Sequence, residues 1–476
     1  MRRTGATCDP APGRAREPDA PKNVMTSKLA FGLLAATLAA PFLVAQDPKA
    51  ILTAAETKKL QGLVRDWFEP WNEWNESRED KNARKLQKKA EDAKDKFQKE
   101  WDARSKKSDL LASMPDLRAV FAQPFTSPRV SGSGILKVVR ETPEMGGHAV
   151  FIPREYKSDG VPMRVIWELP GTKGGKWQSA KEYFTETWEG SLSNKDSLFI
   201  VSEFPEGMDA DPLPDPSLPN PEDVEKKRVR QIFMPFGFEA KQLNYDRDRI
   251  YLDCGRESSA FGLRFACYFP QRFAGIVLRH PVEVPKDIRL GSLTGVPVLL
   301  ISSEETKAAC DAIAAALNQL DPGKATILEG KGAYPFKDSQ PEIETWIASQ
   351  VRNVVRTRVL VEPNSDSFKR AHWVAIDQAE RLTGLPADKR PRLLVEADRS
   401  TNRIKVEARG VEAFTLLLND DLIDLSKEFT VDINGKLSTE KRERNLTLMV
   451  EQIMRNSDPA WIFTQSYTAK VPKEGK

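Results

Sequence analysis

Histidine and cysteine are scarce in this chain of 476 residues, which contains three His and four Cys. The cysteines include no C-x-x-C pair, so we expect neither a disulfide-framed scaffold nor a cysteine zinc site. The Gly-rich run at 171–175 (GTKGG) lacks the Lys-Ser/Thr ending of a phosphate loop, and we expect no metal and no cofactor. Any catalytic histidine must be His148, His280 or His372.

The chain also lacks a large excess of positive or negative charge. Lys+Arg is 72 and Asp+Glu is 69, with 40% hydrophobic and 30% charged residues. This composition excludes collagen-like, wholly disordered and polytopic membrane proteins, and it gives no reason to expect nucleic-acid binding. At roughly 100–200 residues per domain, the length allows two to four domains.

One long apolar run, residues 29–45, follows Lys28 and ends before the polar Gln46. This pattern is typical of a secretory signal peptide over about 25–45, cleaved near Ala45. A retained anchor is the alternative, but the run is interrupted by Pro41, and a span needs about 20 apolar residues. We therefore predict a leader and signal over 1–45, a secreted or periplasmic protein, and no stable membrane span after cleavage. Whether residues 1–24 are translated stays open.

Residues 46–125 are highly charged and have a helical hydrophobic period, which predicts a hairpin of two helices. An aromatic stripe around Trp67, Trp71 and Trp74 predicts the seam of this hairpin, and Pro70 is expected to break the first helix. A sugar- or membrane-binding surface is the alternative for the stripe. Charges alternate in sign along both helices, which favours a solvated face.

Residues 130–356 alternate buried-strand patterns with helical stretches. The expected strands are 165–169, 198–202, 250–253, 275–278 and 296–302. This alternation predicts a doubly wound, mainly parallel α/β sheet. A Pro-rich insertion at 204–221 is expected to be a loop over one rim.

Residues 358–476 predict a separate, mainly β module. Alternating patterns predict strands at 392–396, 403–408, 413–418 and 428–433, a tight turn at Asn434-Gly435, and one helix near 446–454. The simplest arrangement is a small sandwich packed by that helix.

The run YDRDRIYLDCGRESSAFGLRFACYFPQRFAGIVLR at 245–279 resembles the nucleophile region of secreted α/β-hydrolases of the polyhydroxybutyrate-depolymerase and feruloyl-esterase type. In that family a strand leads into G-x-S-x-G and a helix follows. Residues 149–171 look like the two strands before the family's His-Gly oxyanion loop. Residues 295–306 look like the strand that delivers the acid, and 327–336 look like the loop that delivers His. The C-terminal module resembles tails on esterase-like proteins of some bacteria. The resemblance thus implies an α/β-hydrolase-like core.

The family's catalytic residues are replaced in this register. Arg256 stands at the nucleophile position, Thr306 at the acid and Ala333 at the His. Arginine has no lone pair to attack a carbonyl, and no imidazole is in register to take a proton. In the oxyanion loop a proline precedes Gly171, and Glu257 brings a negative side chain next to the oxyanion position.

Two main functions remain open. The first is a hydrolase-like protein without catalysis, which acts in binding or as a scaffold at the cell envelope and takes a small anionic or ester-like ligand. The second is a serine esterase or peptidase-like hydrolase with a rearranged site, in which Ser258 and His280 form a dyad oriented by Glu304 or Glu305. An unrelated chemistry in the same pocket is a third alternative.

Arg256 is expected at the N-terminus of the helix after the elbow, where backbone N–H groups favour an anion. That anion is either a bound carboxylate or phosphate, with Gly171 and Glu257 lining the site, or an internal partner. We expect the internal ion pair, with Glu304 or Glu305, because both follow the strand that leads to this pocket.

Overall fold

The computed structural model describes residues 50–76, 81–140, 142, 145–204, 220–285, 288–382, 385–386 and 388–472. The predicted leader and signal peptide and most of the Pro-rich insertion lie outside these residues. None of the described helices is both long and apolar enough to cross a bilayer. Residues 48–476 form one compact unit. The domain boundaries near 125–130 and 356–358 stay predictions.

The N-terminal helices form a hairpin, as predicted, from α1 (Ala54–Glu76) and α2 (Ala83–Ser105), followed by η1 (Leu110–Ala112) and α3 (Met114–Val120). Trp67, Phe97 and Trp101 are buried at the seam. The expected break at Pro70 is wrong, because this residue lies buried inside a continuous α1. Proline removes one helical hydrogen bond, and the packing of α1 against α2 and α3 offsets that cost.

The central sheet is α/β-hydrolase-like and mainly parallel. Among the described residues its strand order is β1-β2-β6-β3-β7-β8-β9-β10. Strand β2 is antiparallel to both of its neighbours, β1 and β6, and all the pairs from β6 to β10 are parallel. The strands are β1 (Leu136–Val139), β2 (His148–Phe151), β3 (Met163–Leu169), β6 (Ser197–Ser202), β7 (Tyr245–Gly255), β8 (Gly275–Arg279), β9 (Val298–Ser302) and β10 (Ala325–Glu329). The expected strands are confirmed, and β10 adds a strand to the segment that was expected to be a loop.

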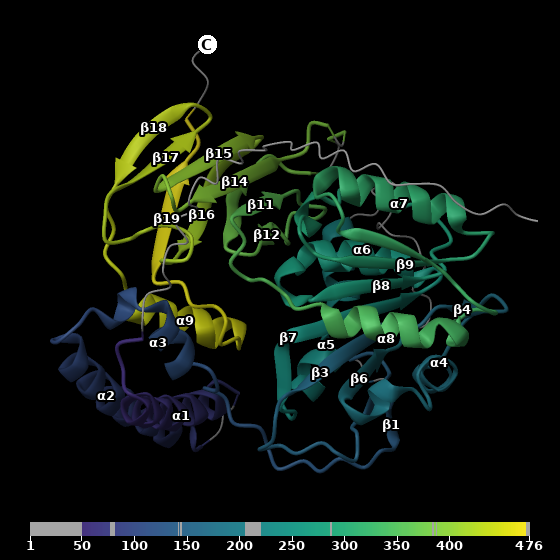
Figure 1. Ribbon diagram of the computed structural model, residues 1–476, viewed down its shortest axis with the longest axis horizontal. Helices are drawn as coiled ribbons and strands as arrows, with labels where there is room; N and C mark the ends of the chain where they lie inside the picture. Colours follow the sequence, from purple (N-terminus) through teal and green to yellow (C-terminus); the bar gives the residue numbers. More distant parts are fainter. Residues whose placement is uncertain are drawn as a thin grey trace, which may run out of the picture. The chain divides into compact units, whose positions relative to one another are not determined.

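Helices cover both faces of this sheet, so the sheet is doubly wound. One face packs against α5 (Pro221–Ala240), α6 (Ser258–Tyr268) and α7 (Lys307–Leu320). The other packs against α4 (Ala180–Thr187) and α8 (Gln340–Ser349), and Figure 1 shows α8 across the near side. Burial on both faces explains why the inner strands are continuous apolar runs in the sequence. The connections also contain a short hairpin and single turns: β4 (Thr172–Lys173), β5 (Lys176–Trp177), η2 (Leu192–Lys195), η3 (Pro270–Arg272), η4 (Gly291–Leu293) and η5 (Lys337–Ser339).

The C-terminal module has two sheets around one core. The first contains β11 (Arg358–Val361), β14 (Arg392–Asp398), β15 (Arg403–Arg409), β17 (Phe429–Ile433) and β18 (Lys436–Glu440). The second contains β12 (Arg370–Ala371), β13 (Val374–Ala379), β16 (Val411–Leu418) and β19 (Gln465–Lys470). The tight Asn434-Gly435 turn is confirmed, because both residues have positive φ and β17 pairs with β18 directly across it.

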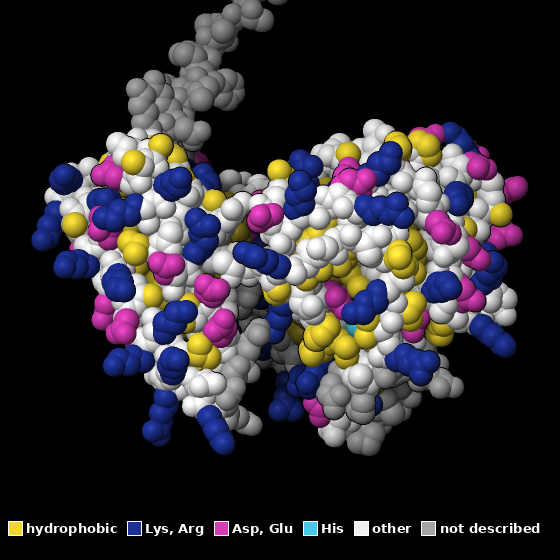
Figure 2. All heavy atoms as spheres, turned by 90° about the horizontal axis from the view of Figure 1, so that it is seen from below, with side chains coloured by type: hydrophobic (Ala, Val, Ile, Leu, Met, Phe, Trp, Pro, Cys, Tyr) yellow, Lys and Arg dark blue, Asp and Glu magenta, His cyan; other side chains and the backbone are white. Residues whose placement is uncertain are grey.

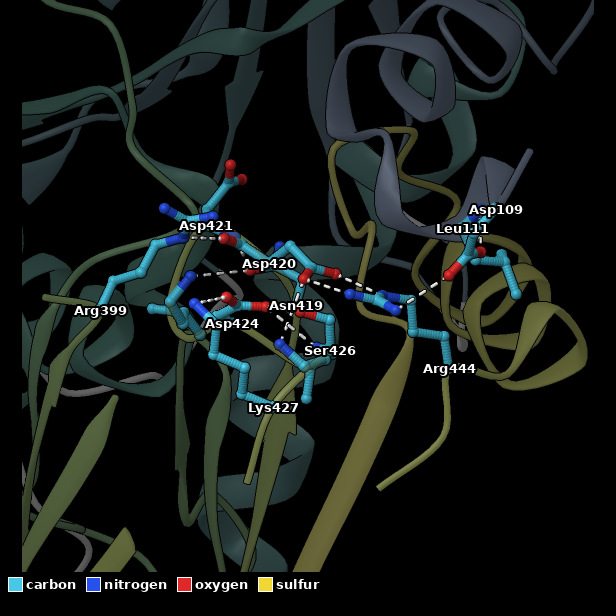
Figure 3. A network of polar contacts seen from close by, with 12 residues as sticks. Asp109, Leu111, Arg399, Asn419, Asp420, Asp421, Asp424, Ser426, Lys427 and Arg444 are labelled. Atoms are coloured by element: carbon cyan, nitrogen blue, oxygen red, sulfur yellow. Dashed lines mark hydrogen bonds and ion pairs between the residues drawn. The ribbon is translucent and has the colours of Figure 1, made fainter. Parts of the chain in front are cut away.

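Helix α9 (Leu446–Asn456) has a different partner from the one expected. Its buried side chains Met449, Val450 and Ile453 join the core of the N-terminal helices, not the core between the two β sheets. Figure 3 shows Arg444, just before α9, pointing between Asp420 of the β module and Asp109 of the helical segment. The helical segment and the C-terminal module therefore share a core and an ion-pair network.

A buried arginine joins the β module to the central sheet. The Arg352 side chain is 2% exposed and donates two hydrogen bonds to Asp458, at 2.6 and 2.8 Å, and one to Asp248 at 2.8 Å. Although burial opposes it, Arg352 holds the pKa of the Asp458 carboxyl below its usual range.

Both charge signs are spread over the surface. Figure 2 shows basic and acidic side chains interspersed on one face of the described residues. Such a mixed surface is typical of solvated faces.

We expect Arg352→Met to lower the free energy of unfolding by about 3 kcal/mol, because it removes the cation that is hydrogen-bonded to the buried Asp458 carboxylate. Urea titration measures this loss. As a control, Lys405→Met breaks only an exposed pair with Glu407 and should leave the midpoint nearly unchanged. Equal midpoints for the two variants would contradict the role given to Arg352.

Candidate functional site

The strand-to-helix turn between β7 and α6 has the strained backbone of a nucleophile elbow. Arg256 occupies the turn with a φ of 45°, a region that side chains other than glycine rarely adopt. Its N–H donates to Arg279 O at 2.7 Å. A Cβ at Gly255 would lie 2.2 Å from Tyr334 Oη and 3.0 Å from Gly171 N, so this position requires glycine.

The Arg256 side chain does not form the expected ion pair. Its Cζ lies 4.6 Å from the centroid of the Tyr334 ring, a cation–π contact. Its Nε is buried and has no hydrogen-bond partner among the described residues, and no ion pair of the described part joins it to Glu304 or Glu305. Both carboxylates are exposed, so water solvates them at little cost.

The Glu257 side chain is hydrogen-bonded to the loop that follows β3, which corresponds to the oxyanion loop in the sequence resemblance. Its Oε2 accepts a hydrogen bond from Thr172 N–H at 3.1 Å, across 85 residues of sequence. In a hydrolase of this fold, an N–H from the loop after β3 helps to stabilise the oxyanion. The negative side chain therefore lies where the sequence placed it, and it already uses one N–H group of the loop.

Tyr334 fills the space between the elbow and that loop. Its hydroxyl donates to Gln178 Oε1 at 3.4 Å, and a Cβ at Gly171 would meet Tyr334 Oη at 2.7 Å. Burial raises the pKa of the Tyr334 hydroxyl, so it stays protonated. Ala333, which the sequence resemblance places at the His position, is exposed beside it and offers no titratable group.

His280 follows β8 with a φ of 56° and is only 6% exposed. Its Nε2 lies 3.6 Å from Glu305 Oε2, and its Nδ1 is buried without a hydrogen-bond partner among the described residues. Burial, and then the charge of Arg256, lower the pKa of the His280 imidazole from its usual 6.5. The structure thus brings His280 close to Glu305, as the rearranged-site hypothesis requires.

Ser258 does not complete that dyad. It is fully buried in the first turn of α6, and its Oγ is 2.8 Å from both Leu169 O and Gly255 O. The hydroxyl proton is therefore directed to backbone carbonyls. Cys254 is also buried, and burial raises the pKa of its thiol well above the usual value, which disfavours a thiolate nucleophile.

Thr306, which the sequence resemblance places at the acid position, closes a local turn. It is buried, and its Oγ1 accepts a hydrogen bond from Ser303 N–H at 3.0 Å. A hydroxyl there closes the turn before α7 and offers no charge to orient an imidazole.

A buried charged cluster beneath the elbow was missed from the sequence. Arg279 Nε lies 3.0 and 2.9 Å from the two carboxylate oxygens of Asp253. Glu168 lies opposite Asp253 in the β3–β7 pairing, and burial, followed by the Asp253 charge, raises its pKa well above 4.5. The available signal was the acidic residue near the end of each of these apolar strands.

The other histidines do not reach the elbow. His148 packs inside the fold, with its Nε2 3.1 Å from Glu239 Oε1, and His372 is buried in the C-terminal module. Within the described part of the chain, no group of three or more His, Cys, Asp or Glu side chains could hold a metal ion.

Neither a protein-family model nor a curated protein matches the chain significantly. Similar solved structures include a thermostable esterase (14% identity, 46% of this chain and 63% of that chain, TM-score 0.33). FphF, a fluorophosphonate-binding serine hydrolase of Staphylococcus aureus, is 13% identical over 46% of this chain and 100% of its own, with a TM-score of 0.34. S-formylglutathione hydrolase FrmB of Staphylococcus aureus is 12% identical over 47% of this chain and 99% of its own, with a TM-score of 0.34. The chain thus spans just under two thirds of the esterase's length.

The His280 imidazole should titrate below pH 6.5, and Arg256→Met should raise its pKa because one nearby positive charge is removed. Two-dimensional NMR of labelled His side chains measures both values. Since the folded pKa lies below the unfolded value, His280 contributes stability that is present above about pH 6.5 and is lost as the pH falls. An unchanged His280 pKa in the variant would contradict the proximity of Arg256.

Proposed function

We propose that this α/β-hydrolase-like protein has no hydrolytic activity and acts in binding or as a scaffold. The observation that carries the proposal is Arg256, which takes the strained position of the nucleophile at φ 45°. A guanidinium is never deprotonated at accessible pH and cannot form an acyl intermediate. The position that matters most for the chemistry is therefore occupied by a group that cannot perform it.

The contacts around the elbow support the same proposal. Glu257 holds the N–H of Thr172, so a developing oxyanion would displace one carboxylate and lie close to its charge. Tyr334 packs against Gly171 and Gly255, in the space between loop and elbow. These contacts disfavour a tetrahedral intermediate at the elbow.

The serine hydrolase with a rearranged site is the second candidate, and the closeness of His280 to Glu305 favours it. The nucleophile that this function requires is unfavourable, because Ser258 Oγ is buried and hydrogen-bonded to backbone carbonyls. Activation would require the first turn of α6 to rearrange.

A fluorophosphonate probe separates the two functions, because only an activated serine reacts with it. We expect no labelling of the native protein, because Ser258 Oγ is buried and donates to backbone carbonyls. A serine hydrolase with an intact triad, labelled in parallel, serves as the control. Labelling of Ser258 or Ser259, located by mass spectrometry, would overturn the non-catalytic function.

We also propose that the protein is exported to the cell envelope and cleaved near Ala45, on the pattern of residues 29–45. Expressed in a Gram-negative host, the periplasmic product should begin at or near Gln46, as N-terminal sequencing measures. Leu34→Arg, which places a charge in the apolar run, should retain the protein in the cytoplasm. An unprocessed cytoplasmic native chain would contradict export.

A further inference from the structure

We propose that the elbow binds a small carboxylate through the guanidinium of Arg256 and the imidazole of His280. The inference rests on the proposed loss of catalysis and names the ligand class of the same site. These residues follow adjacent parallel strands, β7 and β8, at their carboxyl ends, where open α/β sheets bind ligands.

The Nε of Arg256 is buried and has no acceptor in the part of the chain that the structure describes. The residue as a whole is partly exposed and can be reached from solvent. The strained backbone and the Tyr334 ring hold the guanidinium in place before any ligand arrives. A guanidinium held in this way can donate two parallel hydrogen bonds to a carboxylate, and it loses little conformational freedom on binding.

His280 supplies the second, independent observation. It is more than nine-tenths buried, and its Nδ1 has no hydrogen-bond partner among the described residues. A buried polar atom left without a partner costs free energy, which a ligand oxygen accepting from Nδ1–H would recover. The imidazole and the guanidinium both contact the Tyr334 ring, whose centroid lies 6.0 Å from the centroid of the His280 ring and 4.6 Å from Arg256 Cζ.

The acidic side chains nearby do not cancel the site. Glu257 is bonded to Thr172 N–H, and Glu305 is 84% exposed, so water and salt screen its charge. Tyr334 is held in its neutral form by burial.

The position of the Arg256 guanidinium favours binding of a free carboxylate over binding of the corresponding ester. In a hydrolase with this elbow, the acyl group of the substrate becomes attached to the nucleophile. A positive charge at that position attracts a free carboxylate, whereas an ester has no charge to offer in return. The site therefore recognises the kind of acid that an ester hydrolase releases.

Isothermal titration of the whole mature chain with acetate, butyrate and benzoate at low ionic strength tests the proposal. We expect saturable binding of at least one of them, weakened at least tenfold by Arg256→Met and also weakened by His280→Asn. Arg249→Met is the matched control, since it removes an arginine from the same strand outside the elbow and should leave binding unchanged. Urea titration confirms that each variant is folded.

Three results would overturn the proposal: no saturable binding of any of these carboxylates, binding that persists in folded Arg256→Met, or inorganic phosphate binding more tightly than all of them. Fluorophosphonate labelling reports separately on catalysis. A protein that is unlabelled and does not bind carboxylates refutes the ligand class alone, whereas a labelled protein refutes the proposed function.

Discussion

The buried side chain of Arg279 connects the parts from which the elbow is built. Its Nε binds Asp253 at the end of β7, and its Nη atoms donate to Pro335 O at 3.0 Å and Gln340 Oε1 at 3.2 Å. Its own carbonyl accepts the N–H of Arg256. One residue thus fixes β7, β8 and the loop that carries Tyr334. Removing one member of such a buried pair leaves a charge without compensation, so the elbow and the loop depend on it together.

Much of the central sheet could be predicted because its inner strands are buried on both faces. Such strands are short apolar runs between turn signals, and the runs at 165–169 and 275–278 lie within β3 and β8. The edge strand β10 was missed, since its residues are mostly exposed and show neither a continuous nor an alternating apolar pattern. Helix α9 was predicted from its own period, but a period identifies the apolar face and not the partner that covers it.

In the candidate site, too, the sequence predicts local features but not the contacts between distant segments. The elbow is local, because a strand, a tight turn and a helix follow one another in the sequence, and the position of Arg256 could be counted from its neighbours. The side-chain contacts are not local. Glu257 meets Thr172 across 85 residues, and Arg256 meets the Tyr334 ring on a distant loop. The ion pair of Arg256 with Glu304 or Glu305 was predicted from charge alone. In the structure the guanidinium contacts the Tyr334 ring instead of a carboxylate.

A strained elbow without its serine needs a physical reason to persist. A non-glycine residue at positive φ costs about 1–3 kcal/mol, which the surrounding contacts must offset. The surroundings supply the reason: Arg279 O holds the N–H of residue 256, Ser258 Oγ bonds to Gly255 O across the turn, and Gly255 leaves room for Tyr334. Relaxing the turn would break these contacts and disturb β7, β8 and α6 together. The backbone is thus maintained by packing, and the side chain at position 256 is held at the carboxyl edge of the sheet by contacts that do not depend on its chemistry.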